Sequence, residues 1–155
     1  MKKSLAWLIL GTLLALAPAA GAQTNPVKAR PAPVQPEPAK GHLIIIGGGD
    51  RLQPILKSFI ALADRFQSGK IVIYLMASGV PMEDGPATLA DFQKLGAKSV
   101  VWVNLTRDQA MVQDNADALN DVGGVYFEGG DQSRLTAALL DTPIHAKIMD
   151  LYRRG

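Results

Sequence analysis

The stretch Gly123–Gly155 reads GGVYFEGGDQSRLTAALLDTPIHAKIMDLYRRG and decides the fold. Its apolar run Val125–Phe127 predicts a short buried strand, and Gly129 and Gly130 predict a tight turn at the end of that strand. Two successive helices are expected after the turn. Asp131 can cap the first helix, because its carboxylate can accept the free backbone N–H groups of the first turn.

The second helix is expected to begin at Thr142 as its cap, with Pro143 at the first helical position, where the missing N–H costs nothing. It should end at Gly155, which readily adopts the left-handed conformation that stops a helix. Apolar residues recur at helical spacing in both helices. They are Leu135, Ala138 and Leu139 in the first helix, and Ile144, Ile148 and Leu151 in the second.

An earlier apolar run, Leu43–Ile46, ends in Gly47-Gly48-Gly49. A continuous apolar run of this length predicts a strand that is buried on both faces of a parallel sheet. Asp50 can cap a helix after it, whose apolar positions recur at three and four residues over 52–66. Gly69 is expected to end this region.

Two more strands are expected in the middle of the chain, at Ile71–Met76 and Val100–Val103. The Gly- and Pro-containing segment Ala77–Pro86 is expected to be a loop after the first of them. Loops in this position lie at the carboxyl edge of the sheet, where open α/β sheets bind their ligands. A short helix is expected to follow this loop and to end at Gly96.

Thr106 and Gln109 match a capping box and predict a helix that runs toward Val122. Strands that alternate with helices form βαβ units, and these give a parallel sheet with right-handed crossovers. The expected fold class is therefore α/β, an open and mostly parallel sheet with helices on both faces.

The N-terminus has the pattern of a secretory signal peptide. Lys2 and Lys3 precede the apolar run Leu5–Leu16, and Ala20–Ala22 is a small-residue cleavage site. The alternative is an uncleaved membrane anchor, but the run is shorter than the ~20 residues that a spanning helix needs. Residues 1–22 therefore predict an exported protein, periplasmic or extracellular, with no stable membrane span after cleavage.

Residues 23–40 contain five prolines and little apolar surface, which predicts an extended linker before a folded domain at 41–155. The domain carries 11 Lys and Arg against 13 Asp and Glu, without a basic run, so nucleic-acid binding has no support. The chain has no cysteine, which excludes disulfides from the stabilisation of an exported form.

The run Gly129–Thr136, with position 133 left out, and the later Asp141–His145 resemble the cyanophycinases. These are serine peptidases related to peptidase E, with a fold like class I glutamine amidotransferases. Gly47–Gly49 and Met76–Gly79, each after a predicted strand, are similar to the same family. The resemblance spans about residues 41–155.

Several expectations follow from this resemblance alone. It implies hydrolysis of cyanophycin, a poly-aspartate backbone with arginine on each side chain, to β-aspartyl-arginine through an acyl-enzyme. The implied partner is this arginine–aspartate polymer or another acidic peptide, and a homodimer is possible. The resemblance implies no cofactor.

The resemblance also implies a role for the turn made by Gly129, Gly130, Asp131 and Gln132. Backbone N–H groups of this turn resemble half of an oxyanion hole in the family, and the side chain at Gln132 is expected to face the substrate. A helix N-terminus after two glycines presents unpaired donors, which can stabilise developing negative charge. The other interpretation is ordinary helix capping by Asp131, and both can hold together.

In the family, the helix that ends at the position of Gly155 leads into a strand and then a Gly-x-Ser-Ala-Gly elbow with the nucleophile. No Gly-x-Ser-x-Gly occurs in this sequence. The resemblance thus implies no catalytic residue in this chain, which would be an inactive N-terminal portion, truncated before the nucleophile strand, with apolar surface left uncovered. The alternative is a non-catalytic α/β module that binds a small ligand or peptide.

Other candidate sites have a simpler interpretation. Gly47–Arg51 can cradle a phosphate, but it lacks the third glycine and the Lys-Ser/Thr of the nucleotide motifs, so a tight turn is favoured. Ser78 needs a base within reach, yet His42 is expected at the opposite end of the sheet and His145 within a helix. A loop serine and a structural histidine are therefore expected. The acidic residues show no metal-ligand spacing, so no metal is expected.

Overall fold

The structure is a computed structural model that describes residues 38–49, 52–66 and 68–155. The predicted signal peptide over residues 1–22, most of the predicted linker and the predicted cap Asp50 lie outside these ranges. None of the helices in the described ranges combines the length and the hydropathy that crossing a bilayer requires.

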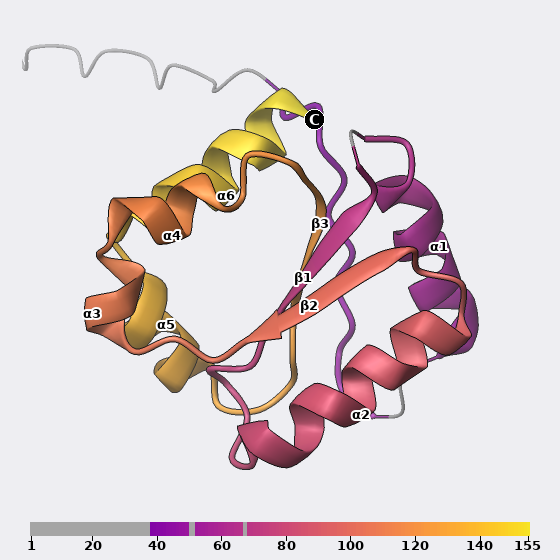
Figure 1. The fold of residues 1–155 in the computed structure, drawn as a ribbon, viewed down its shortest axis with the longest axis horizontal. Coiled ribbons are helices and arrows are strands. Elements are labelled where there is room, and N and C mark those ends of the chain that lie inside the picture. Colours follow the sequence, from indigo (N-terminus) through magenta and orange to yellow (C-terminus); the bar gives the residue numbers. More distant parts are fainter. Residues whose placement is uncertain (1–37, 50–51, 67) are drawn as a thin grey trace, which may run out of the picture. The chain divides into compact units, whose positions relative to one another are not determined.

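Three parallel strands form the sheet in the order β2-β1-β3 (Figure 1). The central strand is β1 (Lys70–Tyr74), flanked by β2 (Ser99–Val103) and by β3 (Val122–Phe127). Ile71 lies opposite Val100 on one side and Gly124 on the other. The predicted strands in these three regions and the predicted open parallel sheet are confirmed.

Helices cover both faces of the sheet (Figure 1). On one face lie α1 (Gln53–Ala63) and α2 (Pro81–Lys94). The other face carries the four remaining described helices, α3 (Arg107–Ala110), α4 (Gln113–Asp117), α5 (Gln132–Leu139) and α6 (Pro143–Arg154). The predicted α/β class with helices on both faces is therefore confirmed.

The central strand β1 supplies both hydrophobic cores. Successive side chains of a strand point to opposite faces, so a strand between two helical layers must be apolar throughout. Ile71, Ile73 and Leu75 pack with α1 and α2. Val72, Tyr74 and Met76 pack with the helices of the other face.

Gly123 and Gly124 allow α1 to approach β3 closely. A Cβ atom at Gly123 would lie 2.3 Å from the carbonyl oxygen of Ala63, and one at Gly124 would lie 2.8 Å from the ring of Phe59. Neither distance is compatible with a side chain, so the two glycines serve helix–sheet packing as well as the return of the chain.

The predicted strand Leu43–Ile46 is wrong. The segment has no strand ladder, and Leu43 and Ile45 are 69% and 81% exposed. Burial on both faces needs a packed layer over each face of a strand in the sheet. Among the described strands β3 pairs only with β1, so Leu43–Ile46 does not join the sheet. Phe127, the last residue of the edge strand β3 and predicted as buried, is 39% exposed.

The predicted loop Ala77–Pro86 is shorter than expected, because α2 already begins at Pro81. Proline suits the first helical position, and Glu83 and Asp84 in the first turn interact favourably with the positive end of the helix dipole. Pro86 lies within the helix even though it has no N–H to donate to the preceding turn.

The predicted helix from Thr106 toward Val122 is divided into α3 and α4. Its capping box is confirmed, with Thr106 accepting from the backbone N–H of Gln109 and Gln109 accepting from that of Thr106. The Asn115 side chain then donates to the carbonyl oxygen of Gln109 at 2.8 Å. In a continuous helix this carbonyl would accept from residue 113, so the side chain replaces a helical bond and the helix breaks.

The predicted caps of the last two helices are confirmed. Asp131 caps α5 by accepting from the backbone N–H of Ser133, and Thr142 caps α6 by accepting from that of His145. Pro143 occupies the first turn of α6, and Gly155 ends this helix with a φ of 85°.

Candidate functional site at the carboxyl end of the sheet

Two loops meet at the carboxyl end of the sheet, the segment Ala77–Gly79 after β1 and the turn Gly129–Gln132 after β3. The backbone N–H of Asp131 donates to the carbonyl oxygen of Ala77 at 2.9 Å. Gly130, with a φ of 137°, lies so close to this carbonyl that a Cβ atom would stand 2.1 Å from its oxygen. The turn is therefore packed against the first loop and requires glycine at this position.

Most N–H groups of the turn have intramolecular acceptors. That of Gly129 donates to Glu128 Oε1 at 3.1 Å, and that of Asp131 is bonded to Ala77. The backbone N–H groups of Gly130 and Gln132 have no acceptor within residues 38–49, 52–66 and 68–155. Two backbone donors thus remain at the beginning of α5, as stabilisation of an oxyanion requires.

The Asp131 carboxylate is committed to capping. Its Oδ1 accepts from the backbone N–H of Ser133 at 2.8 Å and from the Ser133 hydroxyl at 2.6 Å. These two bonds, and after them the charge of Arg134, hold the pKa of Asp131 below its ordinary value. The carboxylate is therefore ionised at neutral pH and acts as a cap, not as a proton donor.

Ser78 is fixed in the first loop by its own hydrogen bonds. Its hydroxyl donates to Asp84 Oδ2 at 2.6 Å and accepts from the backbone N–H of Val80 at 2.9 Å. The Ser78 carbonyl accepts from Arg134 Nη1 at 3.1 Å. A nucleophilic serine would be bonded to a base such as histidine, so this geometry agrees with the prediction of a loop serine.

His145 has a structural role at the beginning of α6. The Nδ1 of His145 accepts from the backbone N–H of Asp141 at 3.3 Å. The backbone N–H of His145 donates to Thr142 Oγ1 at 3.2 Å. The prediction of a structural histidine agrees with these contacts. His42 directly precedes Leu43–Ile46 and lines the two cavities beside β3 that are described next.

A cavity of about 320 Å³ joins two of the predicted glycine turns. Gly48 and Gly49 line it from one side, and Glu128 and Gly129 line it from the end of β3. A second cavity, of about 420 Å³, follows the outer edge of β3 between α1 and α6, and most of its lining is apolar. The smaller cavity is the one that reaches the candidate turn.

Glu128 is a residue that the sequence reasoning missed. Its Oε2 accepts from the buried Thr88 hydroxyl of α2 at 2.5 Å, while its Oε1 accepts from the backbone N–H of Gly129. An acidic residue between an apolar strand and a Gly-Gly turn was the available signal, because a charge seldom ends a buried strand without a bonded partner.

The described part of the chain holds no cluster of three or more His, Cys, Asp or Glu that could bind a metal ion. The acidic residues of the site are instead bonded to hydroxyl and backbone N–H groups.

The chain is similar in sequence to known cyanophycinases. The cyanophycinases of Trichormus variabilis and of a Nostoc species are each 31% identical to the chain over 124 residues. These residues make up 77% of this chain and 41% of each relative. These matches support a cyanophycinase-like peptidase family for the chain. It thus spans about two fifths of the length of these cyanophycinases.

A solved structure supports the fold of this cyanophycinase-like chain. The crystal structure of a peptidase from an acI-B1 Actinobacterium matches it with a TM-score of 0.58 at 21% identity. The match covers 66% of this chain and 45% of that peptidase. No protein-family model matches the chain. The roles assigned to Gly129, Gly130, Asp131 and Gln132 stay predictions.

Proposed function

We propose that this chain forms the oxyanion and substrate side of a cyanophycinase-like serine peptidase. The observation that carries the proposal is the pair of backbone donors at Gly130 and Gln132, placed at the carboxyl end of a parallel sheet. Sequence similarity to two cyanophycinases supports the choice of reaction.

In the proposed reaction a serine attacks a backbone carbonyl of cyanophycin, and β-aspartyl-arginine is released through an acyl-enzyme. The two backbone donors stabilise the oxyanion that forms on the attacked carbonyl, because such donors are already oriented when the charge develops. The Gln132 side chain binds the substrate beside them.

In this proposal the 155 residues supply neither the nucleophile nor its base. The sequence has no Gly-x-Ser-x-Gly, and Ser78 and His145, the residues considered for those roles, are engaged in local bonds. The 155-residue chain is therefore expected to bind the dipeptide product without hydrolysing the polymer.

The test combines an activity assay with a binding assay. Purified chain is incubated with cyanophycin, and free β-aspartyl-arginine is measured by mass spectrometry; none is expected, and clear release would refute the division of the site. Binding of the dipeptide is measured by calorimetry for wild type, Gln132→Ala and Gln93→Ala. Gln93 is an exposed glutamine of α2. Only Gln132→Ala should weaken binding, and equal affinities in both variants would remove Gln132 from the site.

A second candidate is a non-catalytic module that binds a peptide or small ligand. It is favoured by the absence of any hydrogen-bonded serine–histidine side-chain pair within residues 38–49, 52–66 and 68–155. The intact mass of the native protein separates the two. A mass matching residues 23–155 favours the module, whereas a heavier species with a Gly-x-Ser-Ala-Gly peptide favours the peptidase.

Export and dimer formation belong to the same proposal. Residues 1–22 have the pattern of a cleavable signal peptide, so the mature chain should begin at Gln23 outside the cytoplasm. N-terminal sequencing of the exported fraction tests this. Light scattering of the purified protein tests the homodimer.

A further inference from the structure

We infer that Arg134 is a positioning residue that holds the Ala77–Gly79 loop against the Gly129–Gln132 turn. By fixing the turn, it fixes the directions of the two backbone donors at Gly130 and Gln132. The consequence for ligand binding rests on the proposed function, whereas the attachment of the two loops does not.

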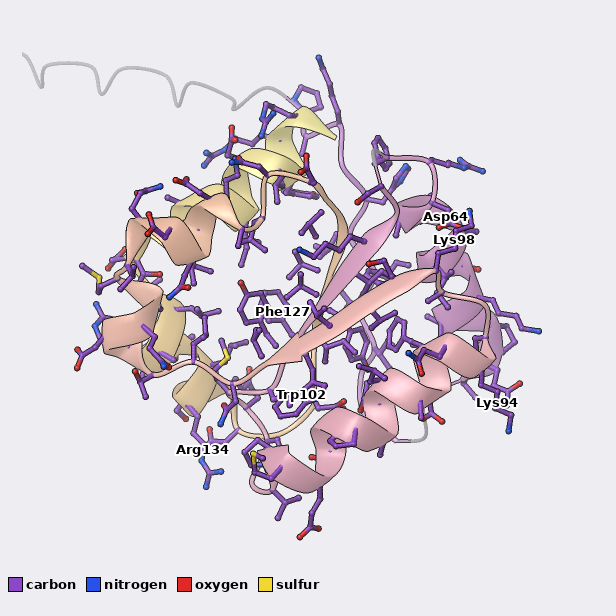
Figure 2. The ribbon with its side chains drawn as sticks, in the orientation of Figure 1. Asp64, Lys94, Lys98, Trp102, Phe127 and Arg134 are labelled. Atoms are coloured by element: carbon purple, nitrogen blue, oxygen red, sulfur yellow. The ribbon has the colours of Figure 1, made fainter. Side chains whose placement is uncertain are left out.

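Arg134 reaches from the first turn of α5 to the other loop. Its Nη1 donates to the carbonyl oxygen of Ser78 at 3.1 Å in a partly buried contact. The same Nη1 would be 3.7 Å from a Cβ atom built at Gly79, so the guanidinium lies near this residue of the loop as well. Figure 2 shows Arg134 extending from α5 toward the loop that precedes α2.

The turn is attached at two consecutive carbonyl groups. The carbonyl of Ala77 accepts from the backbone N–H of Asp131, and that of Ser78 accepts from Arg134. Consecutive carbonyls of an irregular segment point in different directions, so two bonds restrict rotation of the turn that one bond would allow. Gly130 directly precedes the first attached residue, Asp131, and packs against the peptide group that joins Ala77 and Ser78.

The loop that Arg134 holds is itself anchored to α2. The Ser78 hydroxyl donates to Asp84 Oδ2 in the first turn of that helix. Arg134 therefore connects α5 through Ser78 to α2, which lies on the other face of the sheet. Its bond is charge-assisted, and such hydrogen bonds are stronger than neutral ones.

Arg107 of α3 provides a matched control, because it bonds the opposite end of α5. Its Nη1 donates to the carbonyl oxygens of Ala137 and Leu140, each at 3.0 Å. Like Arg134, it is an exposed arginine that bonds backbone carbonyls, but its contacts lie at the end of α5 that is remote from the turn.

The first experiment measures amide hydrogen exchange by NMR in wild type, Arg134→Met, Arg134→Lys and Arg107→Met. In Arg134→Met the amide of Asp131 should exchange about tenfold faster, because loss of one charge-assisted bond lowers the local opening free energy. Arg134→Lys should recover part of this protection, since only one donor of the guanidinium reaches Ser78. Arg107→Met should leave the Asp131 amide unchanged.

Unchanged exchange of Asp131 in Arg134→Met would overturn the inference. So would an equal acceleration in Arg107→Met, because the effect would then reflect general loosening of α5. Thermal unfolding of both methionine variants measures that general loosening separately.

The second experiment measures the dissociation constant of β-aspartyl-arginine for the same variants. Arg134→Met should weaken binding about tenfold, with partial recovery in Arg134→Lys. Weaker binding with unchanged Asp131 exchange would make Arg134 a direct ligand contact and overturn positioning. If the wild type does not bind the dipeptide, the proposed function fails, and the exchange data still decide whether Arg134 holds the turn.

Discussion

Replacing Gly130 by alanine should distort the turn between β3 and α5. Its φ of 137° is unfavourable for a residue with a side chain, which costs about 1–3 kcal/mol. The new Cβ would also lie 2.1 Å from the oxygen and 2.6 Å from the carbon of the Ala77 carbonyl. These are backbone atoms and cannot rotate away, so overpacking adds about 1–3 kcal/mol. We expect a loss of about 2–6 kcal/mol in the free energy of unfolding.

Gly129→Ala is the control, because a Cβ atom at Gly129 would meet no atom within 4 Å and the residue does not have a positive φ. Its cost should stay below about 1 kcal/mol, since it lacks both causes of strain. Urea unfolding followed by circular dichroism gives both values. If Gly130→Ala costs no more than Gly129→Ala, the two loops are not packed as tightly as the distances indicate, and the reasoning fails.

Two further predictions concern the two cores. Gly85→Ala should destabilise the fold by about 1–3 kcal/mol, because its Cβ would lie 2.7 Å from the Trp102 ring and 2.8 Å from Leu75. Urea unfolding at neutral pH measures this loss. An unchanged free energy of unfolding would mean that the Trp102 ring moves freely. Burial raises the pKa of Tyr74 to about 12, against about 10 in the unfolded chain, so the stability it contributes is complete below pH 10 and is lost as the pH rises toward 12. Between about pH 9 and 11, the free energy of unfolding of Tyr74→Phe should fall less than that of wild type in the same assay. An equal fall in both proteins would contradict the role of Tyr74.

The parts of the fold that the sequence predicted depend on short-range interactions. The caps Thr106, Asp131 and Thr142 each bond a group two or three residues away, so the pattern contains both partners. The apolar run Leu43–Ile46 contains only one partner of a strand pair. Whether the run pairs with a strand and is covered on both faces depends on distant residues, and the prediction of a doubly buried strand failed there.

The candidate site shows the same division. The turn and its cap could be predicted because glycine readily adopts the positive φ of a tight turn and aspartate is a preferred N-cap residue. The contact of Gly130 with Ala77, and the bond from Arg134 to Ser78, join segments more than fifty residues apart. The break after α3 was missed for a different reason, since the Asn115 side chain competes with a helical bond at close range.

The side chains of β1 alternate between the two cores, and this arrangement affects how the domain unfolds. One layer of helices packs on Ile71 and Ile73, and the other packs on Val72 and Tyr74 of the same strand. Neither layer can detach without exposing one side of a strand that the other layer needs, so melting should be a single concerted event. A one-residue insertion within β1 would exchange the two sets of side chains and damage both layers at once. This short strand should therefore tolerate insertions poorly.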